Sequence, residues 1–268
     1  MGVAPFPPAT DGPPVPGSAA QPVHAAGPGG SPLVFGVPEF DRRMGAGLLP
    51  GRTVLLEGPV GTGKTTLAAQ FLAQGARSGE RGLMILTDAV PGEFLANMKP
   101  MGFGFEDARR AGAVQVMELT EDLIQLKSQV RAGKIDVRKF ATRLLTDLGK
   151  AIRSGGVRRV VVDPVTPLQL GDEEYARTMF LALPSLNVRT LLTSATLGTK
   201  GSRFELGSSY VSGIVQLSSE LREGRIHREF RVLKMRGTYV EPTAVGYDIT
   251  AQGLVPNPLP PDAPPSSR

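Results

Sequence analysis

One octapeptide constrains the fold more than any other part of the chain: GPVGTGKT, from Gly58 to Thr65. It satisfies the pattern G-x-x-x-x-G-K-[ST], with an apolar run from Val54 to Glu57 before it and an amphipathic stretch after it. Glycines let backbone N–H groups turn inward around phosphates, and the N-terminus of the following helix adds its dipole. A glycine-rich turn with an incidental lysine would need neither flanking element. The motif in this context therefore predicts a phosphate-binding loop between a strand and a helix.

The residue types of the motif predict how a nucleotide and its metal ion would be held. Lys64 would contact the β- and γ-phosphates of ATP, and the hydroxyl of Thr65 would bind Mg²⁺. A second element, RRVVVDP, ends an apolar run at Asp163, where a carboxylate next to the loop would hold Mg²⁺ through water. The alternative is an aspartate that only begins the turn before Pro164. The expected nucleotide-binding residues of the loop are Gly58, Gly61, Thr62, Gly63, Lys64, Thr65 and Thr66.

Short apolar runs alternate with longer segments of helical period, which is typical of a mostly parallel sheet flanked by helices. Strands are expected at Val54 to Glu57, Leu83 to Leu86, Val114 to Glu118, Val160 to Val162 and Thr190 to Thr193. A long amphipathic helix is expected from Asp136, its N-cap, to Arg153. From Gly213 onward, three segments read as consecutive strands, with REGR as the turn of the first hairpin. The predicted fold class is α/β with an antiparallel C-terminal extension.

Composition divides the chain into a folding unit and two tails. Residues 1–32 hold nine prolines and six glycines with one charged side chain, and residues 256–268 hold six more prolines. Such segments bury too little apolar surface to offset their ordering entropy, so both are predicted to be disordered. The domain is therefore expected to span residues 33–255.

Several classes of protein are disfavoured by what the sequence lacks. There is no cysteine, and the two histidines lie far apart, so thiolate and zinc sites are not expected. No apolar run resembles a signal peptide or approaches eighteen residues, which favours a cytoplasmic protein without membrane contact. The net charge of +5 permits nucleic acid as a partner. The basic stretch from Lys127 to Arg159 has almost no interleaved aromatics, however, and is interpreted as a solvated helix face.

The segment FDRRMGAGLLPGRTVLLEGPVGTGKTTLAAQFL resembles the opening of KaiC-type ATPases of the RecA superfamily. The resemblance continues through VVVDPVTPL, LLTSATL, REFRVLKMRGT and YDITAQGLV, and covers nearly all of residues 33–255. It implies a RecA-like fold, ATP with Mg²⁺ as cofactors, and a head-to-tail homo-oligomeric ring, expected to be a hexamer. It does not identify a protein partner.

The resemblance also implies roles for residues far from the loop. Lys234 and Arg236, in KMRG, match the family's cations that reach the γ-phosphate held by the neighbouring subunit. Positions i and i+2 of a strand share one face, so both side chains can converge on one target. The alternative is two surface cations on an edge strand. Thr193 and Ser194 match the family's Thr-Ser pair close to the γ-phosphate.

The chain departs from the family at ILTDAVP. Where the family has two consecutive glutamates that position and activate the attacking water, this chain has Asp88 and Ala89. A general base must lie within hydrogen-bond reach of the proton it takes, and losing such a group typically lowers the rate by ~10²–10⁴-fold. We therefore expect tight binding of ATP and Mg²⁺ with slow hydrolysis that depends on Asp88. Glu93 could substitute only if the loop folds back.

Three other functions remain open at the level of the sequence. Asp88 and Ala89 also fit a nucleotide-gated regulatory scaffold with no useful hydrolysis. The loop from Leu197 to Ser209, with Lys200 and Arg203, occupies the place of the DNA-contacting loop of recombinases, which would suit a DNA-dependent ATPase. Ser208 and Ser209 fall where one KaiC domain autophosphorylates, although such hydroxyls usually complete turns.

Overall fold

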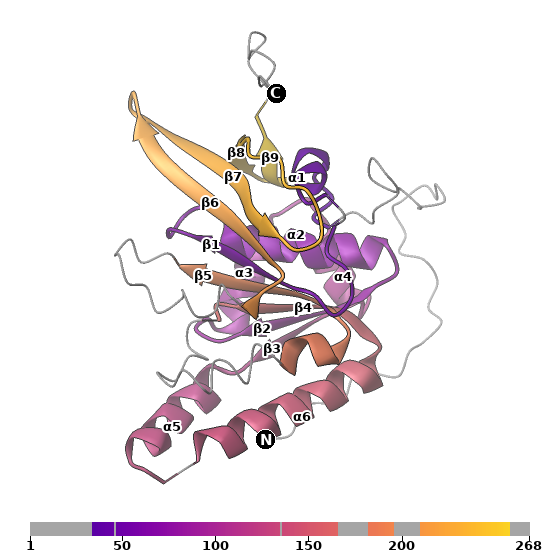
Figure 1. Cartoon of the computed structure of the whole chain (residues 1–268), viewed down its shortest axis with the longest axis vertical. Coiled ribbons are helices and arrows are strands. Elements are labelled where there is room, and N and C mark those ends of the chain that lie inside the picture. The colour runs from indigo at the N-terminus through magenta and orange to yellow at the C-terminus, as the bar shows by residue number, and fades with distance from the viewer. Residues whose placement is uncertain (1–33, 46, 135, 166–181, 196–209, 258–268) are drawn as a thin grey trace.

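The computed structural model describes residues 34–45, 47–134, 136–165, 182–195 and 210–257. Within them, nine strands form one sheet in the order β3-β2-β4-β5-β1-β6-β7-β8-β9. The first six strands in this order run parallel, and β7, β8 and β9 continue the sheet antiparallel. Helices cover both faces of the parallel part (Figure 1). The predicted fold class, a mostly parallel sheet with an antiparallel C-terminal extension, is confirmed.

The parallel strands are β1 (Thr53–Gly58), β2 (Arg81–Leu86), β3 (Val114–Glu118), β4 (Val157–Asp163), β5 (Arg189–Ala195) and β6 (Gly213–Arg222). The antiparallel strands are β7 (Arg225–Met235), β8 (Val245–Thr250) and β9 (Gly253–Pro256). Each strand expected in the parallel part lies inside an observed one. The last expected segment is divided between β8 and β9, because Ala251 and Gln252 form a turn in its middle.

The helices are α1 (Pro38–Arg43), α2 (Lys64–Arg77), α3 (Pro91–Met98), α4 (Phe105–Arg110), α5 (Thr120–Arg131) and α6 (Val137–Gly155), with a short 3₁₀ helix η2 at Leu183–Leu186. Alternation along β1 explains the layers, since successive side chains point to opposite faces. Leu56 packs in the core shared with α1 to α4, whereas Leu55 packs in the core shared with α5 and α6. Asp136 accepts a hydrogen bond from the backbone N–H of Lys139, as expected of the N-cap of α6.

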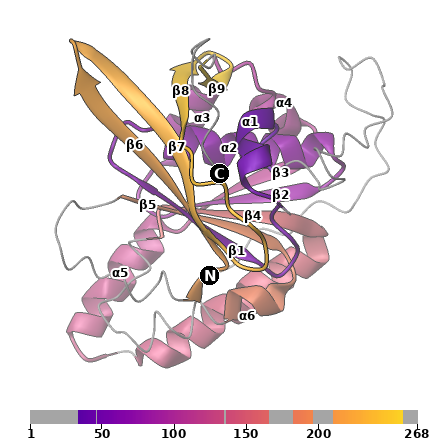
Figure 2. The same ribbon diagram turned by 45° about the horizontal axis from the view of Figure 1, so that its top comes forward.

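The β6–β7 hairpin extends beyond the rest of the sheet as a ribbon (Figure 2). Its turn is at Glu223 and Gly224, both of which have positive φ, and this agrees with the predicted REGR turn. Strands β8 and β9 then bring the chain back over the N-terminal half of α2, where Gln70 accepts from the N–H of Leu254 and Gly63 lies against Ile249 and Leu254. This return matters for the site, because α2 begins at the phosphate-binding motif.

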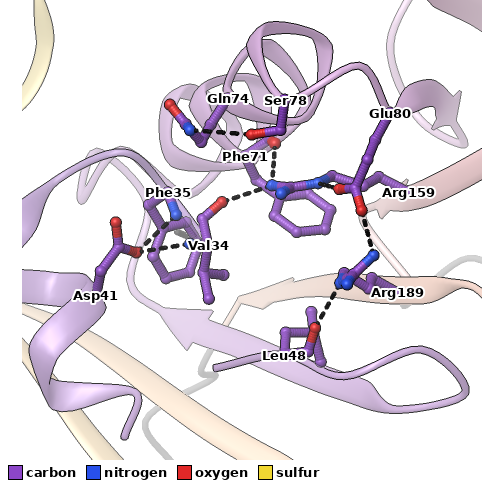
Figure 3. A network of polar contacts seen from close by, with 10 residues as sticks. All are labelled: Val34, Phe35, Asp41, Leu48, Phe71, Gln74, Ser78, Glu80, Arg159 and Arg189. Carbon is purple, nitrogen blue, oxygen red and sulfur yellow. Dashed lines mark hydrogen bonds and ion pairs between the residues drawn. The ribbon is translucent and has the colours of Figure 1, made fainter. Parts of the chain in front are cut away.

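Arg159 lies near the start of β4, at the end of the sheet opposite to the phosphate-binding motif, and holds the N-terminal segment against the sheet (Figure 3). Its side chain is 1% exposed and donates to the carboxylate of Glu80 and to the carbonyls of Val34 and Phe71. Arg189 pairs with the other oxygen of Glu80. A buried cation is tolerated only when it is paired and fully hydrogen-bonded, so this network fixes the chain at Val34. The carboxylate of Asp41 accepts the backbone N–H groups of residues 34–37 and holds the rest of this segment.

None of the helices within the described ranges is long and apolar enough to span a bilayer. The predicted C-terminal tail begins two residues too early, because Pro256 ends β9 and the backbone N–H of Asn257 donates to the carbonyl oxygen of Gly246. The rest of that tail, the predicted N-terminal tail, and the loop from Leu197 to Ser209 with Lys200, Arg203, Ser208 and Ser209 lie outside the described residues. The side chains of α5 and the first half of α6 are described only in part.

Candidate nucleotide-binding site

The phosphate-binding loop connects β1 to α2 as predicted and is shaped by two close approaches. A Cβ on Gly58 would lie 2.4 Å from the carbonyl oxygen of Leu217, so a side chain there would push β6 away from β1. Gly63 has φ +84° and caps α2, and a Cβ on it would lie 3.0 Å from the side chains of Ile249 and Leu254. Only glycine combines this conformation with so close a neighbour. The loop is therefore packed from behind by the C-terminal strands.

Lys64 lies at the first turn of α2, with its ammonium group turned into the loop. Its Nζ donates to the carbonyl oxygens of Gly58 and Pro59, each at 2.8 Å. Partial burial lowers the pKa of Lys64, and the nearby charge of Asp163 opposes that shift. The side chain is thus held at the centre of the loop by weak acceptors that a phosphate could replace.

Asp163 ends β4 and is in contact with the loop, although β4 is not the neighbour of β1. Strand β5 lies between them, and its residue Thr193 donates a hydrogen bond to Oδ1 of Asp163. The hydroxyl of Thr65 is a second hydrogen-bond partner of this carboxylate. Burial raises the pKa of Asp163, while these bonds and Lys64 act in the opposite direction. A hydroxyl and a carboxylate on one spot are oxygen ligands of the kind that Mg²⁺ prefers.

The two members of the predicted Thr-Ser pair take different positions. The Thr193 hydroxyl reaches Asp163, whereas the Ser194 hydroxyl lies 3.3 Å from the carbonyl oxygen of Ala195. Ser194 is buried beside Glu57, which precedes the loop, and adjacent residues of a strand point to opposite faces. Thr193 is thus the member that faces the carboxylate and Thr65.

Asp88 follows the end of β2 and interacts electrostatically with Asp163. Its pKa is raised, first by partial burial and then by the negative charge of Asp163. Thr87 anchors this end of β2, because its hydroxyl donates to the carbonyl of Pro164 and its N–H donates to the carbonyl of Asp163. Glu93 is exposed in the first turn of α3. Asp88 and Asp163 therefore lie close enough to interact at the ends of the neighbouring strands β2 and β4.

Strands β7, β8 and β9 contact three consecutive residues of the loop, from Gly61 to Gly63. The sequence does not predict which residues make these contacts. The hydroxyl of Tyr247 donates to the carbonyl oxygen of Thr62 at 2.6 Å. Arg228 Nε lies 3.4 Å from the carbonyl oxygen of Gly61. These contacts join residues more than 160 positions apart, and no local pattern indicates them. The one available signal was that both residues fall in segments that resemble the family.

Lys234 and Arg236 lie close together but away from the loop of their own chain. Burial and the charge of Arg236 lower the pKa of Lys234, which shows that the two cations are neighbours. Lys234 pairs with Ile214, which pairs with Leu55, three residues before Gly58. Strand geometry places Lys234 roughly 10 Å short of the loop along the strands and roughly 10 Å to the side. The backbone N–H of Arg236 donates to the carbonyl oxygen of Ser212, just before β6.

Comparison with known proteins agrees with this geometry. The family model described as "ATPase: KaiC" matches residues 34–258. The UPF0273 protein PH0284 of Pyrococcus horikoshii is 29% identical over 229 residues, covering 82% of this chain and 91% of the relative. A UPF0273 protein of Thermotoga maritima is 28% identical over 232 residues, covering 82% and 93%.

A solved structure is similar over almost its whole length. The KaiC-like protein PH0186 of Pyrococcus horikoshii superimposes with a TM-score of 0.68 at 25% identity, covering 84% of this chain and 97% of that protein. The phosphate-binding loop, the Asp163–Thr65 contact and the sheet with its antiparallel extension occur together with these matches. The chain belongs to the KaiC family of P-loop ATPases, with a RecA-type fold.

Proposed function

We propose that this protein binds ATP with Mg²⁺, hydrolyses it slowly, and acts as a homo-oligomeric regulatory ATPase with nucleotide at its subunit boundaries. The observation that carries the proposal is that the carboxylate of Asp163 interacts with both the hydroxyl of Thr65 and the charge of Lys64. A cation, a hydroxyl and a carboxylate therefore lie together at the start of α2. Bound Mg²⁺ would neutralise phosphate charge, with Thr65 and Asp163 as its holders.

Slow hydrolysis is inferred from the carboxyl groups that line the site. Asp88 is the residue best placed to accept a proton from water, because it follows the end of β2 and lies close enough to Asp163 to interact with its charge. Ala89 contributes no oxygen beside it. A single shorter base without a partner positions water less well, and rates fall steeply with imperfect geometry.

Assembly is inferred from the placement of Lys234 and Arg236. Fixed cations lower the energy of charge that develops on a transferring phosphoryl group. Lys234 lies roughly 10 Å short of its own loop along the strands and roughly 10 Å to the side, so we propose that the two cations act on the loop of a neighbour. Contacts between two different faces, repeated from copy to copy, close into a ring. A hexamer is the ring size that the family resemblance implies.

The test measures ATP turnover together with molar mass by light scattering, with and without ATP and Mg²⁺. We expect low turnover and a nucleotide-dependent increase in mass. Lys64→Ala should abolish nucleotide binding, whereas Lys150→Ala, an exposed lysine of α6, should not. Asp88→Asn should remove the turnover that remains. A fully active monomer would contradict the assembly.

A nucleotide-gated scaffold is the second candidate, favoured by the replacement of the family's glutamate pair with Asp88 and Ala89. Equal, near-zero turnover in the wild type and in Asp88→Asn, with retained ATP binding, would favour it. A DNA-dependent ATPase would instead show single-strand binding that weakens steeply with salt and stimulates hydrolysis. Incorporation of phosphate at Ser208 or Ser209 would reveal autokinase activity.

A further inference from the structure

The loop from Arg236 to Glu241, after β7, is held at three points by the N-terminal part of the chain. Arg52 Nη1 donates to the carbonyl oxygen of Arg236 at 2.5 Å, and Arg43 pairs with Glu241. Between them, a Cβ on Gly45 would lie 2.6 Å from the hydroxyl of Thr238. This loop, which we call the clamped loop, is therefore fixed against the residues that precede β1.

Tyr239 projects from the centre of the clamped loop and is 80% exposed. An aromatic ring in water on a backbone held at both ends is already ordered for binding, so little entropy is lost when a partner covers it. Tyrosines that become buried in this way are among the residues that contribute most to protein interfaces. The ring lies in the same segment as Arg236, which is also exposed.

The phosphate-binding loop presents a complementary surface at the other end of β1. Val60, at the tip of the loop, is 89% exposed, and Val90, just after Asp88 and Ala89, is 58% exposed. These apolar side chains flank a site that, with a nucleotide bound, would hold the negative phosphates together with Asp88 and the buried Asp163 against the positive charges of Lys64 and Mg²⁺, so that its charge would be negative on balance. The clamped loop offers the aromatic ring of Tyr239 beside the positive charge of Arg236. Its surface therefore complements the loop tip in apolar character and in charge.

We infer that Tyr239 of one copy packs against the tip of the phosphate-binding loop at Val60 of a second copy. This inference rests on the proposed function, and it assigns to the boundary between copies a contact that also aligns Lys234 and Arg236. Because the clamped loop and the loop tip lie at opposite ends of β1, one chain cannot make the contact with itself. The contact joins two different faces, so each copy carries one of each and the contacts can close into a ring.

The chain contains no cysteine, which allows a direct test by disulfide cross-linking. The double variant V60C/Y239C is oxidised in the presence of ATP and Mg²⁺ and examined by non-reducing electrophoresis. We expect a ladder of cross-linked multimers that disappears on reduction. The matched control is L221C/Y239C, in which Leu221, 71% exposed at the end of the hairpin, replaces the loop-tip position. No ladder, or an equal ladder in the control, overturns the inference.

A second measurement tests how much the aromatic ring of Tyr239 contributes to assembly, without altering the phosphate-binding loop. Tyr239→Ala should raise the concentration needed for half-assembly by about tenfold or more, as for a central interface residue. Tyr239→Phe keeps the ring and should assemble like the wild type. ATP binding at low protein concentration should be equal in all three chains. Assembly of Tyr239→Ala at wild-type concentrations would overturn the inference.

The two measurements separate this contact from the proposed function. If the wild type binds ATP but stays monomeric, the contact is overturned while nucleotide binding stands. If the V60C/Y239C ladder forms although no ATP binds to the wild type, the contact stands and the ATPase proposal fails.

Discussion

The phenol hydroxyl of Tyr247 on β8 donates a 2.6 Å hydrogen bond to the carbonyl oxygen of Thr62 in the phosphate-binding loop. Tyr247 is fully buried, and burial raises the pKa of its hydroxyl, so the group stays a hydrogen-bond donor throughout the physiological range. The C-terminal extension therefore does more than continue the sheet. It sets the shape of the loop that would hold the phosphates.

Tyr247→Phe should weaken nucleotide binding and lower stability by about 1 kcal/mol, because a buried carbonyl oxygen loses its partner. Isothermal calorimetry with ATP and urea unfolding would measure the two effects. Tyr239→Phe, which removes a solvent-exposed hydroxyl, is the matched control and should change neither. An unaltered affinity in Tyr247→Phe would show that the loop keeps its shape without this bond.

Asp163→Asn should make the metal-free protein more stable and should also abolish its stabilisation by Mg²⁺. Burial holds the folded pKa of Asp163 above its unfolded value, so its favourable contribution is complete below the unfolded pKa and is lost as pH rises through the folded pKa. At neutral pH without Mg²⁺, the amide should therefore raise the free energy of unfolding by about 1 kcal/mol. The additional thermal shift caused by ATP and Mg²⁺ should disappear. A less stable apo variant would contradict this reasoning.

Asp88→Glu combined with Ala89→Glu should raise ATP turnover, by about 10²-fold if the pair regains both water positioning and proton transfer. Nucleotide affinity should change little, because the residues that contact phosphate are untouched. Single-turnover measurements separate the chemical step from product release. An unchanged rate would mean that the geometry beyond β2, and not the length of the carboxylate side chain, limits hydrolysis.

The pH dependence of turnover should carry the signature of Asp88. Its pKa is raised by burial and by the charge of Asp163, so the base is lost at a higher pH than for an ordinary aspartate as the solution is acidified. We expect kcat to fall as pH is lowered through this raised value. Asp88→Asn should show no such step in whatever rate remains, and an identical profile in both proteins would exclude Asp88 as the base.

Arg159→Met should be strongly destabilising, by about 3–5 kcal/mol, because Glu80 loses a buried partner and the carbonyls of Val34 and Phe71 lose their donor. Arg158→Met alters the adjacent, exposed side chain and should have almost no effect. Chemical denaturation of both variants gives the comparison. Equal stabilities would show that Glu80 is adequately held by Arg189 alone.

Local chemistry made much of the parallel core predictable. The motif from Gly58 to Thr65 requires a strand before it and a helix after it, and β-branched runs such as that ending at Asp163 favour buried strands. The turn in the middle of the last predicted strand was missed, because Ala251 and Gln252 carry no strong turn signal. Tertiary pairing of β8 with β7 and of β9 with β8 overrode the local pattern.

The sequence by itself determined that the chain has a phosphate-binding loop, an acidic strand end at Asp163 and a shortened carboxylate at Asp88, because these depend on residue type and spacing. Only the tertiary structure decided that β5 intervenes and brings Thr193 to Asp163, that Tyr247 holds Thr62, and that Lys234 aligns with a position three residues before Gly58 on β1. Such relations join segments from 30 to more than 180 residues apart. They follow from strand order and register, which the whole core selects at once and no local motif encodes.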